Sequence, residues 1–261
     1  MDRTQQAAGG TVEAPGREHR REAQRAAIET AALRLLDEQG PGAVTTRAVS
    51  AAAGVQAMTI YRLYGDMDGL MVSAAARCVA DYLEAKTTRE RHADPVDDLR
   101  AGWDLHVGFG LGHPYVYAQI YGRYAPDQAN PAADEGAEIL RGLVRRVAEA
   151  GRLTRDVETA AQMIHSAGRG VTLTLMATPP ERRDPSLSHA CREAVLAAVT
   201  VPAAETAAEA EAAGEAADGV LSAADRRHAV ALGAALSSSG AAVPFTEAEH
   251  AMFQEWLGRL T

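Results

Sequence analysis

The stretch TTRAVSAAAGVQAMTIYRLYG, residues 45–65, decides the fold of the N-terminal part of the chain. Its small and apolar residues indicate two short helices, one from about Thr46 to Ala53 and one from about Ala57 to Leu63. Gly54 stands between them, and glycine adopts a positive φ at little cost, so a tight turn is expected there. Two short helices joined in this way are typical of a helix-turn-helix.

A longer helix is predicted before this motif. From Arg17 to Gln39 the apolar residues recur at three- and four-residue spacings, which places them on one stripe of a helix, and Gly40-Pro41-Gly42 ends it. The apolar residues of the motif are spaced to pack against that stripe, and they are Val49, Ala53, Val55 and Ile60. The sequence therefore predicts a three-helix domain over residues 17–66.

The charge of the chain is unevenly distributed. The net charge is −9 at pH 7, from 26 basic and 35 acidic residues. Between Arg17 and Gly65, seven arginines against five acidic residues leave a net charge of +2, so the remaining residues carry −11. The whole molecule therefore lacks the basic character of a general nucleic-acid binder, but its mildly basic head suits local contact with phosphates.

The exposed side of the predicted motif offers groups that suit DNA. Thr45 or Thr46 can cap the first short helix and offer a hydroxyl to a phosphate, and Arg47 can reach a guanine edge or a phosphate. The predicted DNA-contacting residues are Thr45, Thr46, Arg47, Gln56, Ala57, Met58, Thr59, Tyr61, Arg62 and Tyr64. The competing interpretation is a plain three-helix bundle, which explains the small residues but not the polar cluster.

These residues resemble the TetR family of bacterial repressors. The positions that match the family pattern in order are Thr45, Arg47, Ala53, Gly54, Val55, Thr59, Tyr61 and Leu70. The resemblance covers about residues 20–72. It implies a repressor that binds double-stranded, palindromic operator DNA as a homodimer and is released by a small-molecule effector.

The chain departs from the family pattern at the tip of the motif. Gln56 stands where the family usually has Ser or Thr, which weakens the N-cap of the second short helix. Ala57 and Met58 offer only apolar contact, for example to thymine methyl groups. Met67 replaces a common Lys and so removes an expected phosphate contact.

The rest of the chain is also predicted to be helical, so the fold class is all-α. A long helix from about Met67 to Lys86 follows the motif, and further helices are expected at about 95–111, 114–123, 131–150, 156–177 and 186–200. The resemblance implies that residues 67–200 form an effector-binding and dimerisation domain. An effector would then move the long helix and change the separation of the two recognition helices.

Several residues after position 100 are candidates for lining an effector pocket, because pockets are mostly apolar with a few polar groups. The candidates are Trp103, His106, Phe109, Tyr117, Tyr121, Met163 and His165. For any single one of them, an ordinary place in the core is the favoured alternative.

Small residues in the predicted helix 156–177 permit close helix approach, and they are Ala160, Ala161, Ala167, Gly168 and Gly170. Together with the helix at 186–200, this helix could form the two-fold four-helix interface through which the family usually dimerises. Two-fold symmetry suits two half-sites about one DNA turn apart. The alternative is packing within one copy.

The ends of the chain differ in composition from its middle. Residues 1–16 are predicted to be a disordered arm, and residues 201–219 an acidic Ala/Glu-rich linker. Residues 220–261 form a predicted helical extension with a capping box from Thr246 to Glu249. Three roles are open for it: docking through Phe253 and Trp256, extending the dimer interface, or contacting another protein.

Other function classes have less support. Cys78 and Cys191 alone make neither a disulfide framework nor a metal site, and no signal peptide or membrane-spanning run is present, so a cytoplasmic protein without a membrane partner is expected. Residues 108–112 lack the GxGxxG spacing, and no P-loop or HExxH occurs, so neither an enzyme nor a cofactor is predicted. A helical-pocket enzyme, a ligand-independent DNA-binding scaffold regulated through the acidic extension, and activation in place of repression remain alternatives.

Overall fold

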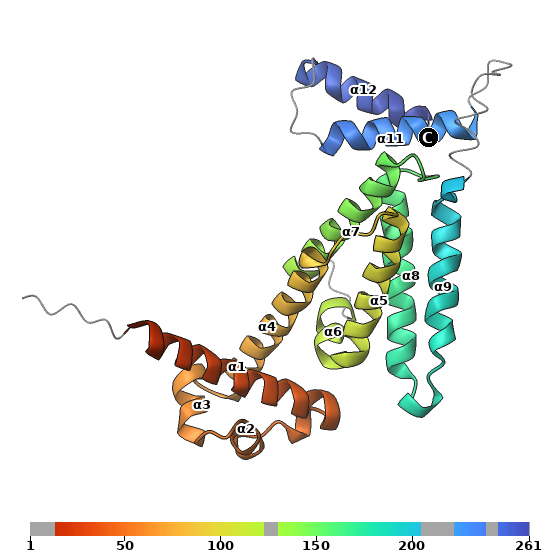
Figure 1. Cartoon of the computed structure of the whole chain (residues 1–261). Coiled ribbons are helices and arrows are strands. Elements are labelled where there is room, and N and C mark those ends of the chain that lie inside the picture. Colours follow the sequence, from red (N-terminus) through yellow and green to blue (C-terminus); the bar gives the residue numbers. More distant parts are fainter. Residues whose placement is uncertain (1–13, 123–129, 205–221, 239–244, 261) are drawn as a thin grey trace, which may run out of the picture. The chain divides into compact units, whose positions relative to one another are not determined.

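The computed structural model describes residues 14–122, 130–204, 222–238 and 245–260 (Figure 1). These ranges are helical and contain no β-strand, although an isolated bridge pairs Leu153 with Thr200. The predicted all-α class is therefore confirmed. The predicted arm lies outside the described residues except for residues 14–16, which are helical, and the predicted linker lies outside them except for residues 201–204.

The chain divides into two compact units, residues 1–80 and residues 81–261. The first unit contains α1 (Ala14–Gln39), the short 3-10 helix η1 (Pro41–Ala43), α2 (Thr46–Ala53), α3 (Ala57–Tyr64) and the first part of α4 (Met67–Thr88). Its core is made by apolar residues of all four α-helices, which are Ile28, Ala32, Leu35, Val49, Ile60 and Leu70. The predicted packing of the two short helices against the first is confirmed.

Local geometry explains where these short helices begin and end. The Thr45 hydroxyl oxygen accepts a hydrogen bond from the Ala48 N–H at 3.2 Å and so caps α2. Gly54 ends α2 with φ 66°, a conformation that favours glycine. Gln56 occupies the N-cap of α3 without a side-chain cap hydrogen bond. This agrees with the weak N-cap that the sequence predicts for α3.

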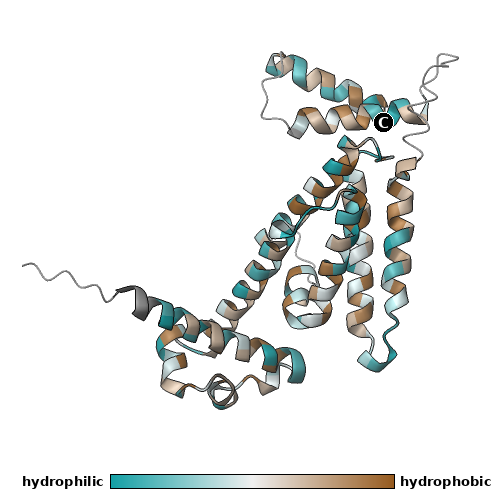
Figure 2. Cartoon of the chain, viewed as in Figure 1, coloured by the Kyte–Doolittle hydropathy of each residue, from teal (hydrophilic) through white to brown (hydrophobic). Residues whose placement is uncertain are grey.

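The second unit begins with the last turns of α4. It continues with α5 (Pro95–Gly112), α6 (Pro114–Tyr121), α7 (Pro131–Glu149), α8 (Val157–Ala177), the 3-10 helix η2 (Pro180–Arg182) and α9 (Pro185–Val199). α5, α8 and α9 run side by side, and α7 packs against α5 and α8 (Figure 1). Hydrophobic and hydrophilic residues recur along these helices, and the hydrophobic ones supply a shared core (Figure 2).

Glycine allows α5 and α8 to approach closely. A Cβ atom at Gly110 of α5 would overlap the Thr172 side chain of α8 and come within 3.0 Å of the Tyr117 ring. A Cβ atom at Gly168 of α8 would lie 3.5 Å from the Trp103 ring, an ordinary van der Waals distance, so the contact there does not itself require glycine. Close packing of α5 on α8 therefore requires glycine at position 110.

A helical pair completes the second unit. α11 (Ala223–Ser238) contacts α7, and α12 (Glu247–Leu260) packs on α11. Val230 and Ala234 of α11 join the core of the unit, and Leu257 of α12 is buried. The Thr246 hydroxyl and N–H both donate to the Glu249 carboxylate at 2.8 Å, and the Glu249 N–H donates to the Thr246 hydroxyl at 3.3 Å, which confirms the predicted capping box. None of the helices in the described ranges is long and apolar enough to cross a membrane.

Candidate functional site

The first unit presents most of the predicted DNA-contacting residues to solvent. The exposed ones are Thr45, Arg47, Gln56, Ala57, Met58, Tyr61 and Arg62. They come from the start of α2, the turn after it and the length of α3. A short, exposed helix that follows a tight turn is the form in which a recognition helix enters a major groove.

The surface of α3 combines polar and apolar groups. The Tyr61 hydroxyl lies 3.1 Å from the Thr46 hydroxyl, so a hydrogen bond joins α3 to the start of α2. Thr46 and Thr59 are half-buried. Met58 is 73% exposed, so packing within the chain does not explain this apolar side chain. Contact with thymine methyl groups would cover it.

Tyr64 points into the unit and not toward the exposed surface of α3. Its hydroxyl donates to the Glu29 carboxylate at 3.2 Å and to the Arg25 carbonyl oxygen at 3.3 Å, and burial raises the pKa of Tyr64 well above its usual range. Glu29 is itself buried and also accepts hydrogen bonds from Ser73 at 2.7 Å and Arg77 at 3.4 Å. These bonds give Tyr64 a structural role in holding α1, α3 and α4 together.

Basic side chains beyond the predicted set also lie on this unit. Arg20 and Arg21 of α1 line a shallow surface depression together with Arg62 of α3. The sequence predicted a mildly basic head between Arg17 and Gly65, but Arg20 and Arg21 were not among the predicted contacts. Guanidinium groups gathered on one surface suit a phosphate backbone.

The second unit contains an internal hollow with a volume of about 50 Å³. The residues that line it come from the end of α4, the residue after it, and α5, α6, α7 and α8, and they are Lys86, Arg89, Leu99, Gly102, Trp103, Leu105, His106, Tyr121, Gly136, Ile139, Leu140, Leu143, Ile164, His165 and Gly168. Four predicted pocket residues, Trp103, His106, Tyr121 and His165, are therefore brought together.

The other three predicted pocket residues lie elsewhere in the same unit. Phe109 is buried and stacks on the Tyr82 ring, with the centroids 4.0 Å apart. Tyr117 is fully buried and lies behind His106, and Met163 packs against the helical core. Tyr117 packs against the rings of His106 and Tyr121, which line the hollow, and Phe109 packs against Tyr117.

His106 is the centre of a hydrogen-bonded group. Its Nδ1 lies 3.0 Å from the Tyr82 hydroxyl, and its Nε2 lies 2.8 Å from the Tyr117 hydroxyl. Burial lowers the pKa of His106 to about 3, and the nearby Lys86 and His165 act in the same direction. His106 is therefore neutral at pH 7, with one ring nitrogen donating and the other accepting.

Lys86 is the pocket residue that sequence reasoning missed. It is the one lysine of a chain that otherwise uses arginine for its basic groups. Its Nζ lies 4.7 Å from the centre of the Tyr82 ring, and burial lowers the pKa of Lys86 to about 8. A signal was available, because Lys86 extends the four-residue row of buried Ala74, Cys78 and Tyr82.

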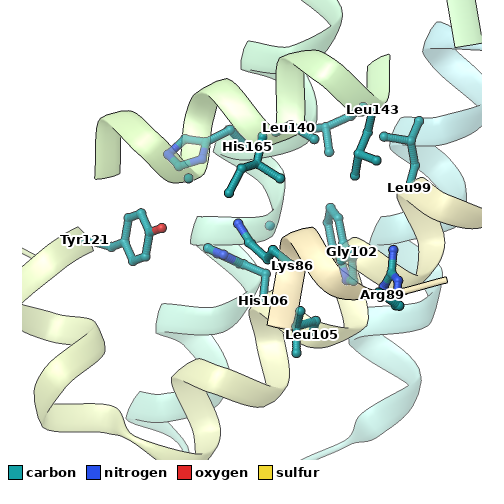
Figure 3. A pocket seen from close by; sticks show the side chains of 15 residues that line it. Lys86, Arg89, Leu99, Gly102, Leu105, His106, Tyr121, Leu140, Leu143 and His165 are labelled. Atoms are coloured by element: carbon teal, nitrogen blue, oxygen red, sulfur yellow. The ribbon is translucent and has the colours of Figure 1, made fainter. Parts of the chain in front are cut away.

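The hollow has a polar end and an apolar end. Figure 3 shows Lys86, His106, Tyr121 and His165 grouped together, whereas Leu99, Leu140 and Leu143 lie on the other side. Burial also lowers the pKa of His165, helped by Arg169 and Lys86. Such a site can hold an apolar molecule and orient it by a polar group at one end.

A helix-turn-helix with an exposed recognition helix, followed by a helical unit with an internal hollow, defines the class of DNA-binding transcriptional regulators. Residues 28–74 match the family model described as bacterial regulatory proteins, tetR family. This stretch contains α2 and α3, so the helix-turn-helix of the chain is that of the family. The match ends before the second unit.

Solved structures extend the comparison of folds beyond the family model. A candidate transcriptional regulator from Saccharomonospora viridis, solved in complex with choline, is 16% identical with a TM-score of 0.60 and covers 69% of this chain and 100% of its own. A TetR transcriptional regulator from Agrobacterium tumefaciens is 18% identical with a TM-score of 0.49 and covers 70% of this chain and 98% of its own. No curated protein sequence matches the chain. The first of these structures shows that the part of the chain it covers follows a known fold.

Proposed function

We propose that this regulator is a repressor that binds a palindromic operator as a homodimer and leaves it when a small molecule occupies the hollow of the second unit. The observation that carries the proposal is the exposed polar and apolar surface of α2 and α3, centred on Arg47, Met58 and Tyr61. DNA would be contacted by this surface, with Arg20, Arg21 and Arg62 supplying contacts to phosphates.

The outer faces of α8 and α9 support the proposed dimer. A Cβ atom at Gly170 of α8 would meet nothing within 4 Å, and Ala190 and Ala194 of α9 are exposed. Small exposed residues on two adjacent helices allow a second copy to approach closely. Ala160, Ala161 and Gly168 of α8 are different, because they are buried within one copy.

Effector release would act through α4. Lys86 near the end of this continuous helix lines the hollow, whereas Leu70 near its beginning belongs to the core of the first unit. The hollow has room for only a few water-sized spheres, so a larger ligand must displace its walls. A ligand that binds one arrangement of α4 better than another shifts the population between them.

The proposal is tested by selecting bound sequences from random DNA with the full chain. We expect a palindromic site with half-sites about one helical turn apart. Arg47→Ala is expected to weaken binding to the selected site by about 10-fold to 100-fold, the range for one bidentate base contact. Arg34→Ala, which removes an exposed arginine of α1 outside the contact set, is the matched control.

Unchanged affinity of Arg47→Ala in a gel-shift titration would contradict the assignment of the reading surface. Binding that no small molecule weakens would favour the DNA-binding scaffold without an effector. Choline, the ligand of the Saccharomonospora protein, is one cationic probe for the effector screen. Substrate turnover without DNA binding would favour an enzyme.

A further inference from the structure

We propose that the hollow of the second unit binds a small amphipathic carboxylate, whose anionic group pairs with Lys86 and whose apolar part lies along α7. The inference rests on the proposed function for the role of the hollow as the effector site. It names the chemical class of the effector from the charge, shape and lining of that hollow.

The charged and titratable groups around the polar end are basic or neutral. Lys86 of α4, His106 of α5, Tyr121 of α6 and His165 of α8 face it. Arg89, just after α4, lines the hollow at its other end, beside Leu99 and Leu143 (Figure 3). α7 contributes only Gly136 and the side chains of Ile139, Leu140 and Leu143 to the described lining. Because none of the described lining residues is acidic, a cationic ligand would meet an ammonium group with no compensating charge, whereas an anion would supply that charge.

Lys86 lacks a counter-ion within the part of the chain that the structure describes. Its ammonium lies against the Tyr82 ring at 4.7 Å, and burial alone accounts for its lowered pKa of about 8. A partly buried ammonium without a carboxylate is costly, because the interior solvates the charge poorly. A ligand carboxylate would remove that cost. At pH 7 Lys86 is still protonated in most molecules and can pair with such a carboxylate.

Gly136 marks a point of α7 that lies close to both the Tyr121 hydroxyl and the Lys86 ammonium. A Cβ atom there would lie 3.0 Å from the Tyr121 hydroxyl oxygen and 3.6 Å from the Lys86 Nζ. The two donors therefore lie close enough together to reach one ligand group at this end of the hollow. The carboxylate group has two oxygens and can accept both hydrogen bonds.

The other end of the hollow sets the second requirement on the ligand. Leu140 and Leu143 of α7 and Leu99 of α5 form an apolar wall, and Figure 3 shows them on the side away from Tyr121. Burying alkyl or aryl groups against this wall is favourable by about 25 cal/mol per Å² of apolar surface. A free inorganic anion would leave the wall uncovered, so an organic acid is the better match.

The lone lysine makes the proposal directly testable in the full-length wild-type chain. Isotopic labelling of lysine introduces one labelled side chain, so an NMR spectrum contains one lysine ammonium signal, that of Lys86. Three probes of equal alkyl length are compared: octanoate, 1-octanol and octyltrimethylammonium. We expect that only octanoate moves the signal strongly. It should also raise the pKa of Lys86 above the value of about 8 in the protein without ligand.

Two variants and a control separate charge from packing. Lys86→Met keeps an apolar stem and is expected to weaken octanoate binding at least tenfold in calorimetric titration, whereas Lys86→Arg retains part of it. Arg155→Met removes an exposed cation that is not among the described lining residues and is expected to leave octanoate binding unchanged. Circular dichroism shows whether each variant is folded, and the wild-type NMR titration does not depend on any variant.

Failure of octanoate to bind, equal binding of octyltrimethylammonium, or unchanged octanoate affinity of Lys86→Met would each overturn the inference. Titration without DNA keeps this result separate from the proposed function. Octanoate that binds at Lys86 without weakening the DNA complex would contradict effector release only. If a cation released the DNA and octanoate did not bind, the proposed carboxylate class of the effector would be wrong, but effector release would stand.

Discussion

Asp98 is a fully buried carboxylate in the second unit, and it is held by charged and polar donors. It accepts hydrogen bonds from the His92 N–H at 3.0 Å and from the His92 ring at 2.9 Å, and it pairs with Arg146 of α7. Burial alone would raise the pKa of Asp98, but these hydrogen bonds and the Arg146 charge outweigh it and keep the pKa below its usual range. The ionised form of Asp98 therefore stabilises the folded chain.

Replacing this carboxylate should change how stability depends on acid. Because the folded-state pKa of Asp98 is lowered, its stabilisation is complete above the unfolded-state pKa of about 3.9 and is lost as pH falls through the lower folded-state value. Asp98→Asn is expected to lower the free energy of unfolding at pH 7 and to flatten its fall in acid. Urea unfolding at pH values from 7 to 3 measures both, and an identical acid slope in variant and wild type would contradict the assignment.

At the scale of single residues, the sequence predicted which residue types the surface offers better than it predicted which way each side chain points. Arg47, Met58 and Tyr61 are exposed as a reading surface requires, but Tyr64 points inward to Glu29. The pair is 35 residues apart, and no local pattern reveals such a contact. Lys86 was missed for a similar reason, since its environment depends on α5 to α8, although its position on the buried row of α4 was visible.

Two neighbouring residues of α12 contribute differently to its packing on α11. Leu257 is buried between α11 and α12, whereas Trp256 is 50% exposed, so docking through Trp256 finds little support and Leu257 takes its place. Leu257→Ala is expected to destabilise the extension by about 2 kcal/mol through the lost apolar contact. Trp256→Ala should change stability by less than about 0.5 kcal/mol, as is usual for an exposed side chain.

Hydrogen exchange followed residue by residue along α11 and α12 measures the difference between these variants. Faster exchange in Leu257→Ala and near wild-type exchange in Trp256→Ala are the expected results. The reverse order would show that the helix docks on its other face.

The bounds of the helices were predictable because they depend on local capping and on glycine and proline. Asp94 accepts a hydrogen bond from the Val96 N–H at 2.8 Å with Pro95 as the first helical residue, and Gly151 follows α7 with φ 69°. Packing partners were less predictable. The small residues of α8 suit both a core and an interface, and only the three-dimensional structure shows that Gly168 faces Trp103 while Gly170 faces open space.

At the scale of the whole molecule, the uneven charge gives the proposed dimer a physical consequence. Two copies bring two mildly basic heads to the DNA, and each copy also carries an acidic remainder that DNA repels. One head with few phosphate contacts binds weakly, whereas two linked heads act with a high effective concentration. Loss of the dimer should therefore abolish tight operator binding even where each head stays folded.

Ala194 of α9 provides the test of this dependence, because it is exposed in a single copy. In the proposed two-fold interface, Ala194→Glu would bury like charges near each other and separate the copies. Light scattering at micromolar concentration should give the mass of a dimer for the wild type and of a monomer for Ala194→Glu, with operator affinity lost in parallel. Ala85→Glu, at an exposed alanine of α4, should change neither property. A dimeric Ala194→Glu variant would place the interface elsewhere, whereas a monomeric variant with wild-type affinity would separate DNA binding from dimerisation.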